Sequence, residues 1–445
     1  MTLSTRWSGS GVATVLALWL LVTGRWGSYV GFDHIGIFVT EIALAVAGVV
    51  FLVQLVRGLV DTKALLTPKP ALALTAVLLI VVIVRLITSA EPSRETFRDF
   101  APYGYAGIAL LTFLTPLARW ERWTVIVFTA FGVHAAWLAF SLLAPDQVAD
   151  FPTIGDAPLF ASRPDFDGMV CGLAVALVVY WLREQRRGPL QVVCLIAFAA
   201  INAALLLILP SRAGLLAFVA AGLVALWTSR RPRRRGPAWR RVARWTLSVL
   251  GLSLAIGILL LSTPGQRLVD SVKGEGQAAG TTNARLVVWR ATTDYITAET
   301  TRTLFGVGFG PDFLHDSGAD KYFEGVTYTG VRSPHNYWLG TWARTGLAGL
   351  AIVVALTFAA AASAIRMLGD RRRQQVTALD VLATLSLVSI PVVGALGVVQ
   401  ESPFGAVPYF WAIGHVARSA YQQRSTAGSQ RSMRTSRPAS SSSST

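Results

Sequence analysis

The chain has 445 residues, of which 53% are hydrophobic and only 14% are charged. Soluble globular domains carry roughly 25% charged residues, so this composition excludes a soluble enzyme, a disordered protein and a secreted disulfide scaffold. The formal net charge is +16, but 36 of the 40 basic residues are Arg, and most of them lie in short clusters between apolar runs. Clusters of this kind orient membrane helices. We therefore expect a multi-pass membrane protein and no nucleic-acid partner.

Twelve apolar segments are candidates for spanning helices, each of which needs about 20 mostly apolar residues. In chain order they cover residues 9–27, 34–56, 71–88, 101–118, 123–143, 166–183, 190–209, 213–228, 245–262, 346–365, 376–399 and 404–420. The first resembles a signal peptide, but no small-residue cleavage site follows it, so we expect it to span the membrane. The expected fold class is an all-α membrane protein of about 12 transmembrane helices, with one large, partly helical extracytoplasmic loop between helices 9 and 10.

The charges between the apolar segments predict which side of the membrane each turn faces. If the N-terminus is cytoplasmic, the inner turns hold 26 basic and 5 acidic residues, whereas the outer turns hold 13 basic and 19 acidic residues. The remaining basic residue, Arg85, lies within the third helix. Basic residues are enriched in cytoplasmic loops. We therefore expect a plasma (inner) membrane protein with both termini on the cytoplasmic side.

Composition divides the chain into four regions. Residues 1–262 hold helices 1–9, residues 263–345 form the extracytoplasmic loop with the helices that carry the candidate catalytic residues, and residues 346–420 hold helices 10–12. Residues 421–445 are rich in Ser and Arg. They have too little apolar content to form a packed core, so a disordered cytoplasmic tail is expected there.

The large loop carries its own helix signals. Residues 281–283 offer N-caps before an amphipathic stretch from Ala284 to Ala298. Ser333 and Pro334 suit the N-cap and the first position of a second helix. Between them, the glycine-rich run 306–310 lacks the Lys-Ser/Thr pair that follows a phosphate-binding loop. A tight turn is expected at this run and not a nucleotide site.

His335 is the candidate catalytic residue. It follows the helix-starting Ser-Pro pair on the outer side, and a helix N-terminus disfavours imidazolium because its partial positive charge opposes a second one. A neutral imidazole can accept a proton from an attacking hydroxyl. The alternative is a capping or interface histidine, an interpretation that better suits the other four: His34, His134, His315 and His415.

The candidate substrate-binding residues are four outer arginines: Arg163, Arg212, Arg285 and Arg290. Arg212 lies in a very short turn between spanning helices, where a charge is costly unless it serves a ligand or partner; snorkelling to the interface is the alternative. Arg285 shares a helix face with Trp289. Arg290 lies four residues before Asp294, so an ordinary surface ion pair explains it at least as well as substrate binding. Because guanidinium groups suit phosphate oxygens, the four arginines predict a cationic pocket for an anion at the membrane surface.

Several motifs are concentrated in and around the large loop. They are Asn-Ala-Arg-Leu-Val-Val-Trp from Asn283, Gly-Val-Gly-Phe-Gly from Gly306, Ser-Pro-His-Asn-Tyr-Trp from Ser333 and Arg-Thr-Gly-Leu-Ala-Gly from Arg344. A Ser-Arg turn at Arg212 and a Glu-Ser-Pro-Phe run from Glu401 accompany them. In this combination the chain resembles the O-antigen ligase/polymerase family, which comprises multipass glycosyltransferases of the GT-C type.

The resemblance implies an activity and residue roles. Members of the family take a glycan from a polyprenyl-diphosphate carrier outside the membrane and attach it to an acceptor hydroxyl. It further implies that Arg212 and Arg285 bind the diphosphate and that His335 is catalytic, whereas Arg163 matches an outer arginine of the family only loosely. Arg344 departs from the pattern, because the family often has Glu there. That departure puts any role for an acid at this position in doubt.

A mechanism and its alternatives follow from this resemblance. Polyprenyl diphosphate is a good leaving group, so arginines that neutralise its charge can act without a metal, and we expect no metal or other cofactor. His335 would deprotonate or orient the hydroxyl of a glycan, lipid or protein acceptor, and the anomeric configuration would invert. A repeat-unit polymerase of the same family is the first alternative. A lipid-linked glycan flippase or transporter is the second, although it should place ionisable residues near the bilayer midplane.

Overall fold

The structure is a computed structural model that describes residues 8–29, 31–32, 37–61, 64, 69–89, 93–115, 117, 122–151, 153–154, 157–158, 160–184, 188–229, 276–323, 332–369 and 376–435. The described chain is almost entirely helical, with two short antiparallel strand pairs. The ninth predicted helix, 245–262, and the arginine-rich turn 230–244 that precedes it lie outside the described residues.

Within the described residues, seven helices are long and apolar enough to cross a membrane: α1 (Gly9–Tyr29), α2 (Val39–Val56), α3 (Pro70–Ile87), α6 (Trp123–Leu143), α8 (Pro164–Glu184), α9 (Pro189–Ile208) and α16 (Tyr337–Gly369). Two further apolar helices are shorter: α10 (Arg212–Thr228) and α17 (Ala378–Gly394). Side chains on α2 and α9 are apolar and mostly exposed, as expected of surfaces that face lipid. The all-α membrane fold is therefore confirmed for the described residues, whereas a count of twelve spans is not.

The remaining elements are short or lie at the ends of the bundle, except for the long helix α18. They are β1 (Gly31–Phe32), β2 (Ile37–Phe38), α4 (Arg94–Gly104), α5 (Gly107–Leu114), α7 (Pro145–Ala149), β3 (Thr153–Ile154), β4 (Ala157–Pro158), α13 (Gly276–Thr297), α14 (Thr300–Phe305), α15 (Phe313–Asp316), η4 (Asp320–Phe323), η5 (Val399–Glu401) and α18 (Pro403–Thr435). Strand β1 pairs with β2 with Gly31 opposite Phe38, and β3 pairs with β4 with Thr153 opposite Pro158.

Helices α8, α10, α17 and α18 form the centre of the bundle. The closest approach is between α8 and α10, where a Cβ added to Gly214 would lie 2.9 Å from the backbone of Gly168. Small residues permit such close helix contacts in membrane proteins. The Ser211 hydroxyl caps α10 by accepting a hydrogen bond from the Gly214 N–H at 2.9 Å. The first turn of α10, which carries Arg212, is thereby held against the start of α8.

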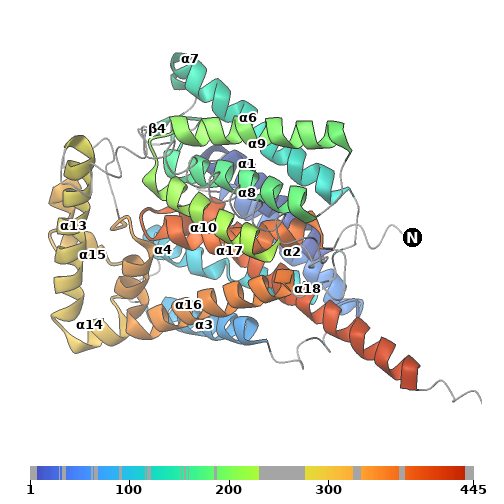
Figure 1. The fold of residues 1–445 in the computed structure, drawn as a ribbon. Coiled ribbons are helices and arrows are strands. Elements are labelled where there is room, and N and C mark those ends of the chain that lie inside the picture. The colour runs from blue at the N-terminus through green and yellow to red at the C-terminus, as the bar shows by residue number, and fades with distance from the viewer. Residues whose placement is uncertain are drawn as a thin grey trace, which may run out of the picture.

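The two ends of the bundle differ (Figure 1). Helices α13, α14 and α15 gather at one end, and the last turns of α18 protrude from the opposite end. At the α18 end, Arg418 forms a 3.0 Å ion pair with Asp61, in the turn after α2. The backbone of Gly9, at the start of α1, bonds to Gln54 near the end of α2. The positions predicted to face the cytoplasm thus lie together, at the end of the bundle away from the large loop.

The fourth predicted helix is corrected. In place of one span over 101–118, the chain forms α4 and α5, with a break at Tyr105 and Ala106. Ser93 caps α4 and accepts a hydrogen bond from the Thr96 N–H, so the helix starts in a polar segment that the apolar pattern did not include. Gly104 and Gly107 flank the break and have low helix propensity.

Two helix starts in the large loop also differ from expectation. Helix α13 begins at Gly276, several residues before the predicted caps at 281–283. The second helix predicted in the loop is the start of α16. It begins at Tyr337 and not at Pro334, because Asn336 is the residue that caps it. The Asn336 Oδ1 atom accepts hydrogen bonds from the N–H groups of Trp338 and Leu339 at 3.1 and 3.2 Å.

The C-terminal segment is helical over part of the stretch expected to be disordered. Helix α18 continues to Thr435, so residues 421–435 extend an existing helix. Continuing a formed helix avoids the cost of nucleation, and the Ala, Gln, Arg and Met residues of this segment have good helix propensity. Residues 436–445 lie outside the described part of the chain.

Candidate active site

Helix α13 crosses the end of the bundle and presents one face to it. Trp289 donates a hydrogen bond from Nε1 to the Pro334 carbonyl at 2.7 Å. One turn earlier, the Arg285 Nη1 atom donates to the Leu396 carbonyl at 2.7 Å. The i, i+4 spacing therefore places both side chains on the inward face, as the sequence predicts. Val288, on the same helix, is buried in a small core with α15 and the first turns of α16.

His335 lies in a tight turn immediately before α16. Its φ of 55° is the left-handed conformation, and among the described residues it is the one non-glycine residue with a positive φ. Such a backbone is uncommon for residues with a side chain and often marks a functional site. Two contacts hold the turn: the His335 N–H donates to Ser333 Oγ at 3.1 Å, and Trp289 binds the neighbouring carbonyl of Pro334.

Positive charge surrounds the His335 side chain. Its pKa is lowered from 6.5 to about 4, first because the side chain is buried and then because Arg285 and Arg163 lie nearby. Asp165 opposes this effect without reversing it. The imidazole is therefore neutral at physiological pH, as expected of a group that accepts a proton. Burial and two arginines thus favour the neutral form of His335, in addition to the helix-start position from which the sequence predicts it.

Arg212 belongs to the same charged group. It lies at the start of α10, and burial followed by the charge of Arg212 lowers the pKa of Arg285. Two cations held this close favour an anion between them. Four of the five predicted site residues are thus neighbours: Arg163, Arg212, Arg285 and His335.

Arg290 is the predicted site residue that the structure does not bring to this group. Its side chain is exposed on α13, and it is not among the charges that act on His335. Within the described residues it also forms no ion pair with Asp294, so the alternative prediction of an ordinary surface ion pair is not supported either. Five residues separate it from Arg285, which turns the two side chains to different faces of the helix.

Arg163 is held in place by two acidic residues at the start of α8. Its Nε donates to Asp165 Oδ1 at 3.2 Å, and its backbone N–H donates to Asp167 Oδ2 at 2.5 Å. Its guanidinium lies 5.3 Å from the ring centre of Phe404. Asp165 and Asp167 have Asp-x-Asp spacing, a pattern that can hold a divalent cation and that the expectation of no metal had overlooked. No group of three or more potential metal ligands occurs among the described residues.

Glu401 is an acidic residue of this site that the sequence analysis did not select. It ends η5, and its Oε1 atom is buried without a hydrogen-bond partner. A Cβ added to Gly340 would lie 3.1 Å from this atom and 3.7 Å from Pro334 Cδ. Burial raises the pKa of Glu401 to about 7. In the sequence, Glu401 begins the Glu-Ser-Pro-Phe run that contributes to the family resemblance, but nothing there marks it as a site residue.

The glycine-rich run 306–310 forms the expected tight turn. Gly306, Gly308 and Gly310 all have positive φ, between 72° and 106°. The turn is held against the kink of α16, where a Cβ on Gly346 would lie 2.2 Å from the Leu304 carbonyl oxygen. Arg85, the basic residue left within the third helix, donates to the Gly306 carbonyl at 2.9 Å. Its role is to anchor this turn.

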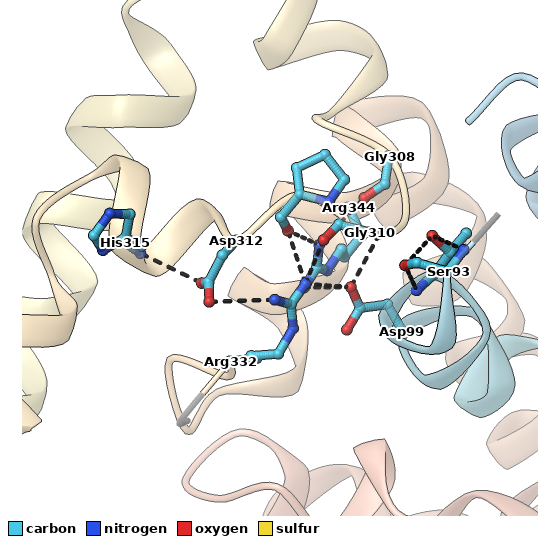
Figure 2. Close-up of polar contacts among 10 residues, drawn as sticks. Ser93, Asp99, Gly308, Gly310, Asp312, His315, Arg332 and Arg344 are labelled. Atoms are coloured by element: carbon cyan, nitrogen blue, oxygen red, sulfur yellow. Dashed lines mark hydrogen bonds and ion pairs between the residues drawn. The ribbon is translucent and has the colours of Figure 1, made fainter. Parts of the chain in front are cut away.

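Arg344 lies in a buried ionic network behind the turn (Figure 2). Its Nη2 atom pairs with Asp99 Oδ2 at 2.8 Å. Arg332 lies between Asp99 and Asp312, at 3.0 and 3.2 Å. The Gly310 N–H donates to Asp99 at 3.1 Å. Asp99 belongs to α4, so this helix connects the loop to the bundle. The pairing with Asp99 accounts for an arginine at position 344, where the sequence departs from the family pattern.

The described helices are those of a multi-pass membrane protein, and Arg163 and Arg285 lie beside a neutral histidine at one end of the bundle. A family model described as O-antigen ligase matches residues 196–354. This stretch includes Arg212, Arg285 and His335, whereas Arg163 and Glu401 lie outside it. The match supports the O-antigen ligase family that the motifs indicate. A comparison with curated proteins finds no match.

Proposed function

We propose that the protein is a membrane glycosyltransferase that transfers a glycan from a polyprenyl-diphosphate carrier to an acceptor hydroxyl on the outer face of the plasma membrane. The observation that carries this proposal is that Arg163 and Arg285 lie beside a neutral histidine at one end of the bundle, with Arg212 beside Arg285. The family match to residues 196–354 supports the same substrate class. The orientation follows from the distribution of basic residues, with both termini cytoplasmic.

In this proposal the arginines bind the diphosphate of the donor. Arg212 and Arg285 come from different elements and lie close enough to depress the pKa of Arg285. A dianionic diphosphate between them would relieve that repulsion and accept charge-assisted hydrogen bonds. The charge that develops on the leaving diphosphate would be stabilised in the same place. No metal is needed for this step, so the proposed reaction is metal-independent.

His335 acts as the general base. Its neutral imidazole accepts the proton of the acceptor hydroxyl as the oxygen attacks the anomeric carbon. A new C–O bond forms to the acceptor while the C–O bond to the diphosphate breaks, and the electron pair leaves with the polyprenyl diphosphate. Attack from the face opposite the leaving group inverts the anomeric configuration. Arg163 supplies further positive charge beside the imidazole.

The choice between a ligase and a polymerase depends on the acceptor. Both use the same donor, and a polymerase adds it to a second lipid-linked glycan. The motifs favour a ligase-like enzyme, with a glycan, a lipid or a protein as acceptor. A deletion strain tests this choice: long lipid-linked chains accumulate if a ligase is lost, whereas single repeat units accumulate if a polymerase is lost.

Replacement of His335 by Ala tests the proposal as a whole. We expect a loss of transfer of about 100-fold or more, the contribution of a general base. His315→Ala is the matched control, because His315 lies in the same loop, is exposed and pairs with Asp320 at 2.8 Å. The measurement is glycan transfer from a polyprenyl-diphosphate donor by the purified protein. Wild-type turnover in His335→Ala would overturn the proposal.

A further inference from the structure

The guanidinium of Arg163 is held at one end and on one face. Its Nε atom donates to Asp165 Oδ1 at 3.2 Å, and its carbon lies 5.3 Å from the ring centre of the buried Phe404. Among the described residues, no acceptor is bonded to its two terminal NH2 groups, and the side chain is 22% exposed. These two groups form the end of a guanidinium that can bind phosphate oxygens in pairs.

Asp165 is itself placed by the segment that follows α17. A Cβ added to Gly397 would lie 2.8 Å from Asp165 Oδ2, so the lack of a side chain at Gly397 makes room for the carboxylate. The neighbouring carbonyl of Leu396 accepts the hydrogen bond from Arg285 Nη1 at 2.7 Å. Residues 396 and 397 therefore contact Arg285 directly and Arg163 through Asp165. Both arginines are tied to one short segment.

A carboxylate is an unexpected neighbour for an anion site, because its charge repels phosphate. Asp165 acts against the cations here, since its charge raises the pKa of both Arg285 and His335. Its presence therefore needs a geometric reason. Arginine has about 2 kcal/mol of rotamer entropy, and a side chain that is held before the ligand arrives loses less of it on binding.

We propose that Asp165 is a positioning residue for donor binding, which holds Arg163 by its Nε atom so that the terminal NH2 groups are presented to a phosphate of the polyprenyl diphosphate. This inference rests on the proposed function, because it assigns Asp165 a part in binding the same donor. Asp165 acts through Arg163 and does not touch the donor. The role requires an oxygen acceptor beside Nε and not a negative charge.

Two substitutions of Asp165 separate the acceptor from the charge. Asp165→Ala and Asp165→Asn both remove the negative charge, but only Asn keeps a side-chain oxygen beside Nε. The measurement is Kd for polyprenyl diphosphate, by isothermal titration calorimetry of the purified protein in detergent. Asp165→Asn should bind at least as tightly as wild type, within about twofold. Asp165→Ala should bind about 10-fold more weakly than Asp165→Asn, which corresponds to one charge-assisted hydrogen bond.

A double variant separates the positioning of Arg163 from support of α8, because Asp165 Oδ1 also accepts the Phe166 N–H at 2.9 Å. In an Arg163→Ala background there is no guanidinium to align, so Asp165→Ala should change Kd by less than about twofold. A 10-fold loss in that background as well would show a general effect on the start of the helix and would overturn the proposal.

The matched control is Glu299→Ala, which removes the carboxylate from another outer arginine, Arg302, and should bind the probe like wild type. Melting curves in detergent show whether each protein is folded. Should Asp165→Ala fail to fold, Asp165→Ser takes its place. Serine is also favoured at a helix start, but its side chain is too short to reach Nε, so the same loss is expected.

Equal Kd values for Asp165→Asn and the shorter variant would overturn the proposal, because the acceptor would then have no effect. Binding is measured without turnover, so the proposed function fails separately. A wild-type protein that binds polyprenyl diphosphate, loses affinity in Asp165→Ala and yet transfers no glycan would contradict the transferase alone. An active wild type with an inactive His335→Ala variant, whose Asp165 variants all bind alike, would contradict the positioning role alone.

Discussion

Arg285 and Arg290 lie five residues apart on one helix but have different surroundings. Arg285 donates to the Leu396 carbonyl and lies near His335, whereas Arg290 is exposed. Hydrogen bonds to charged groups are worth about 1.5–3 kcal/mol. We therefore expect Arg285→Ala to raise KM for the donor by about 10- to 100-fold. Arg290→Ala is the control and should stay within about twofold of wild type. Equal effects of the two substitutions would contradict the assignment.

The lowered pKa of His335 has a consequence for the pH profile. The active form is the neutral imidazole, which is lost only as pH falls through its folded-state pKa of about 4. The ratio kcat/KM reports groups of the free enzyme, so it should be flat between pH 8 and about pH 5.5 and decline below that. Measurement of kcat/KM against pH checks this expectation. A decline centred at 6.5, the ordinary value for His, would show that the imidazole is not buried among cations.

At the scale of elements, the glycine turn and α16 are joined by the buried pair of Asp99 and Arg344. Both side chains are less than one-tenth exposed, and loss of one partner leaves an uncompensated charge. Asp99→Asn should lower the free energy of unfolding by about 3–5 kcal/mol. The control, Glu299→Gln, breaks the exposed pair with Arg302 and should cost under about 1 kcal/mol. Unfolding in detergent measures both, and similar small losses would contradict the anchoring role of Asp99.

Comparison of the predicted and observed helices shows which parts of the fold and of the candidate site can be predicted from the sequence. Apolar runs located α1, α3, α6, α8 and α9 to within a few residues, because the membrane demands length and apolarity. Arg212 was selected because a charge at a membrane turn is costly, Arg285 because it shares a helix face with Trp289, and His335 because it follows a helix-starting Ser-Pro pair. Glu401 and Asp99 were not, because their importance arises from burial against segments distant in the chain. The Asn336 cap was missed because Ser-Pro is also a good helix start.

In the whole molecule, the positions predicted to face the cytoplasm and the candidate site lie at opposite ends of the bundle. Arg418 and Asp61 mark one end, and the arginines around His335 mark the other. In the orientation that we propose, most of the +16 net charge lies on the cytoplasmic side. The arginines of the pocket are the exceptions, and they are the ones that we propose to bind substrate. A transporter would need its polar groups near the middle of the bundle.

The most direct test follows both products of the reaction in proteoliposomes with a polyprenyl-diphosphate-linked glycan and an acceptor. The wild-type protein should release one polyprenyl diphosphate for each glycan transferred. His335→Ala should release about 100-fold less or lower still, and His315→Ala should match wild type. Donor recovered intact on the opposite leaflet, with no polyprenyl diphosphate released, would contradict the proposed transferase and favour a transporter.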